Sequence, residues 1–336
     1  MASGEFEGQG GIMNALTADL GLSPAYSARI DQTSASGGAG IYAAWQSIRS
    51  GASELTLLVG GEKMTHRSTA EATDVIASIT HPAEYKHGIT LPSFAGLTAR
   101  LYLDRYGVSR ERLAEVAVKN HRHGLANGRA QFRTAVTVEK VLESPIVADP
   151  LRLYDFCPIT DGSAALLFTS RERAEELRPD EHVVVSGIGG ASDTHVVHER
   201  ADPTWMDAVA DSSNEAFDRA GLGPEAVDVA ELHDMFTILE FLQMEAVGFA
   251  ERGRAPERVR AGETTVGGEL PINPSGGLKS KGHPLGASGV AQAVELYEQL
   301  TGRAGDRQVE PAEAGLACSV GGFGNCATTT LLEAPR

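Results

Sequence analysis

The stretch "GASGVAQAVELYEQL" at residues 286–300 has a counterpart near the start of the chain, "ASGGAGIYAAWQSIRS" at residues 35–50. Each copy begins with Ala-Ser-Gly and continues with apolar residues at helical spacing. Each is then followed by a β-rich run that reaches Val-Gly-Gly, "ELTLLVGG" at 54–61 and "AGLACSVGG" at 314–322. A long-range repeat of this kind predicts two halves of one pseudo-symmetric α/β fold.

The two halves differ in what surrounds the repeat. The second half shows a complete alternation, with strand patterns at 181–190 and 226–234 and helix patterns at 204–222 and 236–248. The first half has no counterpart of this opening strand and helix. We therefore predict an N-terminal half at residues 1–170 with an inserted loop domain at about 65–155, and a C-terminal half at residues 171–336.

The composition disfavours several classes of protein. The chain carries 29 Lys and Arg against 45 Asp and Glu, a formal net charge of −16, whereas nucleic-acid binding needs a basic surface. Cys157, Cys318 and Cys326 form no CxxC pair, so neither a zinc site nor a disulfide framework is expected. The start "MASGEFEGQGG" lacks the features of a signal peptide, and no apolar run approaches the roughly 18 residues of a membrane span. The composition therefore indicates a cytoplasmic globular protein.

Four segments carry residues suited to acyl transfer. Ser34 precedes the first Ala-Ser-Gly, His233 ends a strand in "ELHDMFT", His283 lies in "NPSGGLKSKGHPLGASG", and Gly321 lies in the Gly-rich "CSVGGFGNC". Taken alone, Ser34 is better explained as a helix N-cap, and His233 as an ordinary strand-end histidine. Together on a repeated scaffold, a serine, histidines and free backbone N–H groups indicate an acyl-transfer site.

The chain resembles the thiolases, in particular the branch of archaeal acetyl-CoA acetyltransferases and sterol-carrier-protein-type thiolases. The matching stretches are "SASGGAG", "LLVGGEKMT", "VKNHRHGLANGRAQ", "CPITDGSAAL", "ELHDMFTI" and "NPSGGLKSKGHPLGASG". The resemblance implies two βαβαβαββ halves and a loop domain that covers coenzyme A. It also implies that Met1 corresponds to an internal methionine, with a central strand of the sheet preceding it in relatives.

The resemblance assigns roles to the motif residues. Ser34 takes the place of the nucleophile, His283 activates it, and His233 helps to form an oxyanion hole. The backbone N–H groups of Ser34 and Gly321 form a second oxyanion hole. Contacts to the substrate and coenzyme A are expected from the Gly-rich loop at Ser275, Gly276 and Gly277.

The sequence departs from the thiolase pattern at three positions. Ser34 stands where relatives have a cysteine, and Met235 stands where they often carry the cysteine that serves as acid and base. Ser319 aligns with the cysteine of the last motif, while Cys318 is one residue away and in a strand would point to the opposite face. Cys318 and Ser319 remain candidate acid/base groups, and Cys157 is expected to be structural.

We expect a β-ketothiolase that condenses two short acyl-CoA molecules through an acyl-Ser34 oxyester. The alternatives are an inactive acyl-CoA-binding or scaffold subunit and an acyl-CoA hydrolase. No cofactor is expected beyond the coenzyme A thioester substrates. The resemblance further implies a homodimer or a dimer of dimers, with a small zinc-ribbon/OB-fold protein as a partner subunit.

Overall fold

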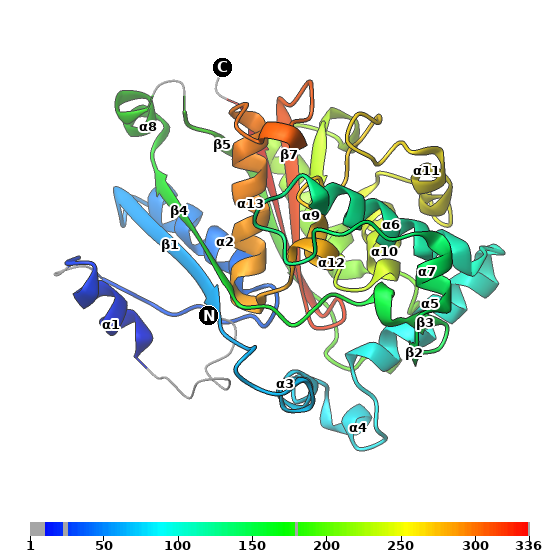
Figure 1. Cartoon of the computed structure of the whole chain (residues 1–336). Helices are drawn as coiled ribbons and strands as arrows, with labels where there is room; N and C mark the ends of the chain where they lie inside the picture. The colour runs from blue at the N-terminus through cyan, green and yellow to red at the C-terminus, as the bar shows by residue number, and fades with distance from the viewer. Residues whose placement is uncertain (1–10, 23–25, 179–180, 335–336) are drawn as a thin grey trace.

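Two central helices lie side by side between two β-sheets in the computed structural model, which describes residues 11–22, 26–178 and 181–334 (Figure 1). These helices are α2 (Ser36–Arg49) and α13 (Leu285–Leu300), the two copies of the repeated pattern. A Cβ added to Gly37 would lie 2.6 Å from the backbone nitrogen of Val290 and 2.7 Å from the Cα of Gly289. The repeated glycines therefore let the first turns of the two helices touch backbone to backbone.

The strand patterns at 54–61, 181–190, 226–234 and 314–322 correspond to strands of the structure, whereas the strand at 326–333, which completes the C-terminal sheet, was not predicted. The strands are β1 (Leu55–Glu62), β2 (Ile146–Ala148), β3 (Leu151–Arg152), β4 (Gly162–Thr169), β5 (Val184–Ser192), β6 (Val229–Glu231), β7 (Ala314–Gly321) and β8 (Cys326–Glu333). The C-terminal sheet has the order β5-β8-β7-β6, in which only β6 and β7 are parallel. In the N-terminal half, β1 and β4 form an antiparallel pair, and β2 and β3 form a separate small one.

The repeat is visible in the strand registers as well as in the helices. β1 pairs with β4 from Leu55↔Thr169 to Glu62↔Gly162, and β7 pairs with β8 from Ala314↔Glu333 to Gly321↔Cys326. In these matching ladders Glu62 takes the place of Gly321. The Val-Gly-Gly match in the sequence aligns Gly60 with Gly321, two residues away from the alignment that the ladders give. A shift of two residues leaves each side chain on the same face of the strand.

The remaining helices are α1 (Ile12–Asp19), α3 (Thr69–Ala77), α4 (Pro82–Tyr85), α5 (Leu91–Tyr106), α6 (Arg110–Leu125), α7 (Val138–Glu143), α8 (Arg171–Leu177), α9 (Asp207–Ala220), α10 (Thr237–Val247), α11 (Ala255–Ala261) and α12 (Gly277–Lys281). Of these helices, α3 to α7 belong to the segment between β1 and β4, α9 to α12 belong to the C-terminal half, and α1 and α8 lie before β1 and after β4. All residues of α10 are buried, as expected for a helix inside the core.

The mixed α/β architecture with two related halves confirms the predicted fold class. Within the described ranges, no helix combines the length and the apolar character needed to cross a bilayer. The expectation about Met1 and the segment before it concerns residues outside the described ranges.

Candidate active site

Ser34 lies in a tight turn that leads into α2, and only 2% of its surface is exposed. The preceding Thr33 has a φ of 50°, an uncommon backbone conformation for a non-glycine residue. The Ser36 hydroxyl donates to the carbonyl of Thr33 (2.6 Å) and accepts from the amide of Gln32 (2.8 Å). The N-cap of α2 is Ala35, without a side-chain cap. The interpretation of Ser34 as a helix cap is therefore wrong, because Ser36 is the residue that holds the turn.

Gly321 brings the end of β7 against the turn of Ser34. A Cβ at Gly321 would lie 2.8 Å from the Oγ1 of Thr33 and 2.9 Å from the carbonyl oxygen of Gln32. A larger residue would displace the turn, so this position requires a glycine. The structure thus places two sequence-predicted elements, the turn and the Gly-rich loop, in direct contact.

His283 is buried, and Ser288 fixes its ring. The Nδ1 of His283 lies 2.7 Å from the Oγ of Ser288, and this hydroxyl donates to the carbonyl of Pro284 (3.0 Å). Because the serine proton is directed to Pro284, the serine oxygen accepts from Nδ1–H. The Nε2 of His283 is then an unprotonated acceptor, and it has no partner among the described residues.

His233 lies beside His283 at the end of β6. The two ring centroids are 4.8 Å apart and the ring planes are nearly perpendicular, at 88°. The backbone of His233 is held at both ends by Gln243, which accepts from its amide (2.8 Å) and donates to its carbonyl (2.9 Å). Within the described chain, both ring nitrogens of His233 lack a hydrogen-bond partner. The two histidines therefore form one buried cluster with three available nitrogens.

Burial keeps both rings neutral. The pKa of His283 is lowered to about 3, first by burial and then by the charge of Lys281. The pKa of His233 is lowered well below its usual value by burial, with smaller contributions from His283 and Lys281. At neutral pH both imidazoles are therefore uncharged, the form in which a histidine accepts a proton.

A buried network of polar side chains begins at Asp234, the residue after His233, and the sequence analysis did not predict this network. The carboxylate of Asp234 accepts from the amide of Leu278 (2.6 Å) and from the Nδ2 of Asn120 (2.7 Å). Asn120 also donates to Glu240 (2.9 Å), which lies 3.0 Å from the ammonium group of Lys119. Burial, followed by the charge of Glu240, raises the pKa of Asp234 to about 7. The network ties the segment after His233 to α6, α10 and α12.

The Gly-rich loop before α12 is buried in the same region. Ser275 donates to the carboxylate of Glu231 (2.8 Å), and its amide donates to the same group (3.1 Å). Gly276 and Gly277 have φ values of 97° and 59°, and a Cβ at Gly277 would lie 2.4 Å from a carboxylate oxygen of Asp234. These contacts give the loop a positioning role, and its proposed contacts with coenzyme A stay a prediction.

The two candidate acid/base residues of β7 face opposite sides of the sheet. Cys318 accepts from the hydroxyl of Thr329 (3.8 Å), which contacts Ser212 and Ser213 of α9. Ser319 faces the central helices instead, because its Oγ would lie 2.6 Å from a Cβ at Gly289. Cys318 therefore points away from the face that holds the Ser34 turn, as the one-residue offset predicts.

The other two positions of interest are also placed. Met235 is buried, and its carbonyl accepts from the amide of Cys157 (2.9 Å). Burial raises the pKa of the Cys157 and Cys318 thiols to about 12, so both are protonated at neutral pH. All three cysteines, Cys326 included, are free thiols.

Both halves of the chain are similar to proteins of the thiolase family. The family model for the thiolase N-terminal domain matches residues 1–172, and the thiolase C-terminal domain-like model matches residues 189–334. The acetyl-CoA acetyltransferase of Methanothermobacter thermautotrophicus is 41% identical over 99% of this chain and 86% of that protein. The benzoylsuccinyl-CoA thiolase subunit BbsB of Thauera aromatica is 32% identical over 84% of this chain and 72% of that protein.

Solved structures agree on the fold. The structure of the Ltp2-ChsH2(DUF35) aldolase matches with a TM-score of 0.85 and 24% identity, over 96% of this chain and 83% of that chain. Human mitochondrial 3-ketoacyl-CoA thiolase matches with a TM-score of 0.66 and 15% identity, over 91% and 78%. With both halves matched by family models and relatives similar over nearly its full length, the chain belongs to the thiolase family and is an acyltransferase of the thiolase type.

Proposed function

We propose that the protein is a β-ketothiolase that condenses two short acyl-CoA molecules, reversibly, into a 3-oxoacyl-CoA and free coenzyme A. Ser34 would carry the acyl group. The observation that carries this proposal is the placement of His283, whose Nδ1 lies 2.7 Å from the Oγ of Ser288 and whose Nε2 has no partner among the described residues and can act as a base. A serine needs such a base, because its hydroxyl is a poor nucleophile without one.

In the first step His283 takes the proton of the Ser34 hydroxyl as the oxygen attacks the thioester carbonyl. The oxyanion of the tetrahedral intermediate is stabilised by the backbone N–H groups of Ser34 and Gly321, aided by the N-terminal end of α2. The C–S bond then breaks, and His283 returns the proton to the leaving thiolate. Free coenzyme A leaves, and Ser34 holds the acyl group as an oxyester.

In the second step a base removes a proton from the α-carbon of another acyl-CoA. The resulting carbanion attacks the ester carbonyl of acyl-Ser34, the C–O bond breaks, and the Ser34 oxygen is reprotonated. Cys318 is poorly placed for this role, because it faces α9. We therefore assign the α-carbon base to the pair of His233 and His283, whose rings are in contact.

The test is incubation of the protein with acetyl-CoA, followed by measurement of acetoacetyl-CoA, free coenzyme A and the intact protein mass. We expect acetoacetyl-CoA together with an acetyl adduct on Ser34. Ser34→Ala should abolish both, whereas Ser186→Ala, a control on β5, should change neither. Free coenzyme A without a carbon–carbon product would indicate a hydrolase. Neither product nor adduct would indicate an acyl-CoA-binding subunit without turnover.

A second candidate function is retro-aldol cleavage of a 3-hydroxyacyl thioester. It is favoured by the orientation of Cys318 away from the Ser34 face and by Met235, which supplies no acid or base. The two neutral histidines would supply the base for this reaction. One removes the hydroxyl proton as the carbon–carbon bond breaks, and the thioester enolate is then protonated to acyl-CoA. The solved structure with a TM-score of 0.85 is named as an aldolase.

The two candidates respond differently to one substitution. Retro-aldol cleavage forms no acyl-enzyme, so Ser34→Ala should retain cleavage of a 3-hydroxyacyl-CoA to a carbonyl compound and acyl-CoA. Thiolase activity should be lost in the same variant. Activity of Ser34→Ala on 3-hydroxyacyl-CoA alone would therefore replace the thiolase assignment.

We also propose a cytoplasmic homodimer or dimer of dimers that works with a small zinc-ribbon/OB-fold protein. Support comes from the name of BbsB, a thiolase subunit, and from the structural neighbour in which Ltp2 is paired with ChsH2(DUF35). Light scattering of the purified chain measures the oligomer. Full activity of the chain alone would contradict an obligatory partner subunit.

A further inference from the structure

The turn between β7 and β8 follows Gly321, and two side chains hold its shape. Gly322 and Gly324 have φ values of 60° and 81°, in the left-handed region that favours glycine. Two glycines leave the backbone of a short turn many accessible conformations, so its geometry depends on hydrogen bonds. These come from Asn325, within the turn, and from Arg200, in the segment between β5 and α9.

Asn325 closes the turn through both its backbone and its side chain. Its amide donates to the carbonyl of Gly321 (3.0 Å), and its Oδ1 accepts from the amide of Phe323 (2.9 Å). Its Nδ2 donates to the carbonyls of Thr194 (2.8 Å) and His195 (3.1 Å). Asn325 therefore joins the turn after Gly321 to the segment that follows β5.

Arg200 reaches the same turn from the segment before α9, and only 2% of its side chain is exposed. Its Nη1 donates to the carbonyl of Phe323 (2.6 Å), while its Nε lies 2.8 Å from a carboxylate oxygen of Asp193. The amide of Asp193 in turn donates to the carbonyl of Asn325 (2.8 Å). One planar guanidinium thus spans the turn and the residue after β5, which a lysine ammonium cannot do, because it is a compact point charge.

The turn lies between Arg200 and the residues that precede Ser34. A Cβ at Gly324 would lie 3.4 Å from the Nη1 of Arg200, in van der Waals contact. A Cβ at Gly321 would lie 2.8 Å from the Oγ1 of Thr33. A shift of the turn away from Arg200 would therefore change where the Gly321 amide lies relative to Ser34.

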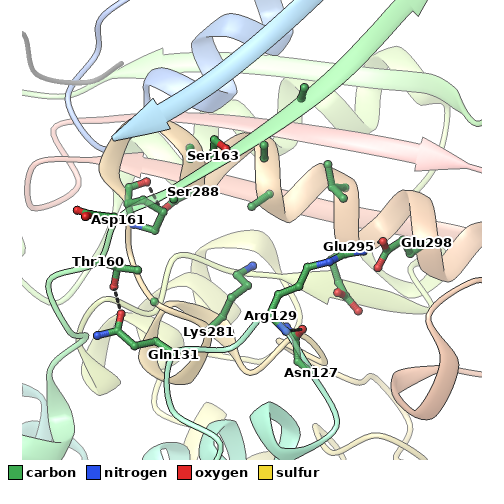
Figure 2. Close-up of a pocket in the computed structure, with 18 of the residues that line it drawn as sticks. Asn127, Arg129, Gln131, Thr160, Asp161, Ser163, Lys281, Ser288, Glu295 and Glu298 are labelled. Carbon is green, nitrogen blue, oxygen red and sulfur yellow. Dashed lines mark hydrogen bonds and ion pairs between the residues drawn. The ribbon is translucent and has the colours of Figure 1, made fainter. Parts of the chain in front are cut away.

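Arg200 contacts a different part of the site from Ser288. Ser288, which holds the ring of His283, lines a cavity of about 640 Å³ between β4 and α13 (Figure 2). Neither Arg200 nor any residue of the turn at 322–325 is among the described residues that line this cavity. The base and the backbone donor are therefore held by separate sets of contacts, one from α13 and one from the segment after β5.

We propose that Arg200 is a positioning residue of acyl transfer, which acts by fixing the turn next to the Gly321 amide. This inference rests on the proposed function, in which that amide stabilises the oxyanion of the tetrahedral intermediate. A misplacement of about 1 Å in an active site can cost on the order of a hundredfold in rate. Loss of the contact between Arg200 and Phe323 should therefore slow acylation of Ser34.

The test compares a reaction at position 34 that forms an oxyanion with one that does not. The first is acylation of Ser34 by saturating acetyl-CoA. The second is alkylation of the thiol in Ser34→Cys by iodoacetamide, in which the sulfur displaces iodide in one step. Peptide mass spectrometry gives both rates. We expect Arg200→Lys to slow the acylation at least tenfold and to change the alkylation less than twofold.

Two further variants complete the test. Arg258→Lys is the matched control, because Arg258 also donates to the carbonyl of a phenylalanine, Phe249, and pairs with Glu263 (2.6 Å), but in α11. It should leave both rates unchanged. Asn325→Asp keeps an acceptor for the Phe323 amide and loses the two donations to the segment after β5. It should slow the acylation and not the alkylation, as Arg200→Lys does.

Each other outcome has a definite meaning. Equal acylation rates with and without Arg200→Lys would overturn the inference and leave the proposed function intact. Equal slowing of acylation and alkylation would give Arg200 a structural role and would also overturn the inference. If circular dichroism shows that Arg200→Lys does not fold, the same criteria apply to Asn325→Asp. No acylation of the unsubstituted chain would overturn the proposed function, and the inference with it.

Discussion

The Nδ1 of His283 and the Oγ of Ser288 are joined by a hydrogen bond of 2.7 Å, and the hydroxyl proton of Ser288 is directed to the carbonyl of Pro284. This arrangement sets which ring nitrogen is free to act as a base. Ser288 is therefore a positioning residue. It is the counterpart of Ser36 in the repeat, which holds the turn of Ser34 in the same way.

Removal of the Ser288 hydroxyl should slow acyl transfer. In Ser288→Ala the ring of His283 can adopt the other tautomer, so we expect the rate of acyl-enzyme formation to fall by about tenfold to a hundredfold, part of what a general base contributes. Ser288→Thr keeps the hydroxyl and should restore most of the rate. Equal loss in both variants would assign the defect to packing instead of the hydrogen bond. The measurement is single-turnover release of coenzyme A.

The stability of the fold should decrease in mild acid. Burial lowers the pKa of His283 and His123 to about 3, so the folded state binds fewer protons than the unfolded chain. The stabilisation is complete above pH 6.5 and is lost as the pH falls toward 3. At pH 5 the free energy of unfolding should be lower than at neutral pH by about 2 kcal/mol for each of these histidines.

The measurement is urea unfolding at several pH values between 5 and 7.5. His123→Gln removes one titrating group outside the candidate active site. This variant should lose less stability between pH 7.5 and pH 5 than the parent chain does. The slope of its unfolding free energy against pH near pH 5 should correspond to roughly one bound proton fewer. The same slope in both proteins would contradict the assignment of His123 as a buried neutral histidine.

The contact between the two central helices should be intolerant of a single methyl group. A Cβ at Gly37 would meet the backbone of α13 at 2.6 Å, so Gly37→Ala should destabilise the fold by about 1–3 kcal/mol or more. Gly128→Ala is the matched control, because a Cβ there meets nothing within 4 Å. Similar midpoints of chemical unfolding for the two variants would disprove the close approach.

This contact also shows what the sequence could and could not predict. The Ala-Ser-Gly repeat predicted two equivalent helices, and their glycine contact is the physical reason for the pattern. The Val-Gly-Gly repeat led to an equivalence that is displaced by two residues. A shift of two residues keeps every side chain on the same face of a strand, so only the pairing with β4 and β8 reveals that Glu62 replaces Gly321.

The candidate site was predictable only in part. His233 and His283 were recognisable from their motifs, and the structure brings their rings together. The network around Asp234 and Glu240 also includes Lys119 and Asn120, which lie more than 100 residues earlier in the chain. Lys119, Asn120 and Asp234 lie in stretches that match the thiolases, but nothing in those stretches indicates that the fold buries them against one another.

The nucleophile position should accept a thiol. Ser34 lies at the N-terminal end of α2, where the helix dipole favours a negative charge. We expect Ser34→Cys to form the acyl-enzyme faster, by about tenfold or more, because a thiol is partly ionised at neutral pH. The burst of coenzyme A release from acetyl-CoA measures this step. A large loss of the burst would mean that the pocket is adapted to an oxygen nucleophile.

The face of β7 that holds Ser319 should be the place to restore an acid/base thiol. Ser319 points toward the central helices and its hydroxyl has no partner among the described residues, whereas Cys318 points toward α9. In the Ser34→Cys background, Ser319→Cys should therefore increase condensation of acetyl-CoA beyond the effect of the first substitution. Cys318→Ser should leave the rate unchanged, because its side chain does not face the Ser34 turn. A rate that depends on Cys318 and not on residue 319 would reverse the assignment of the two faces.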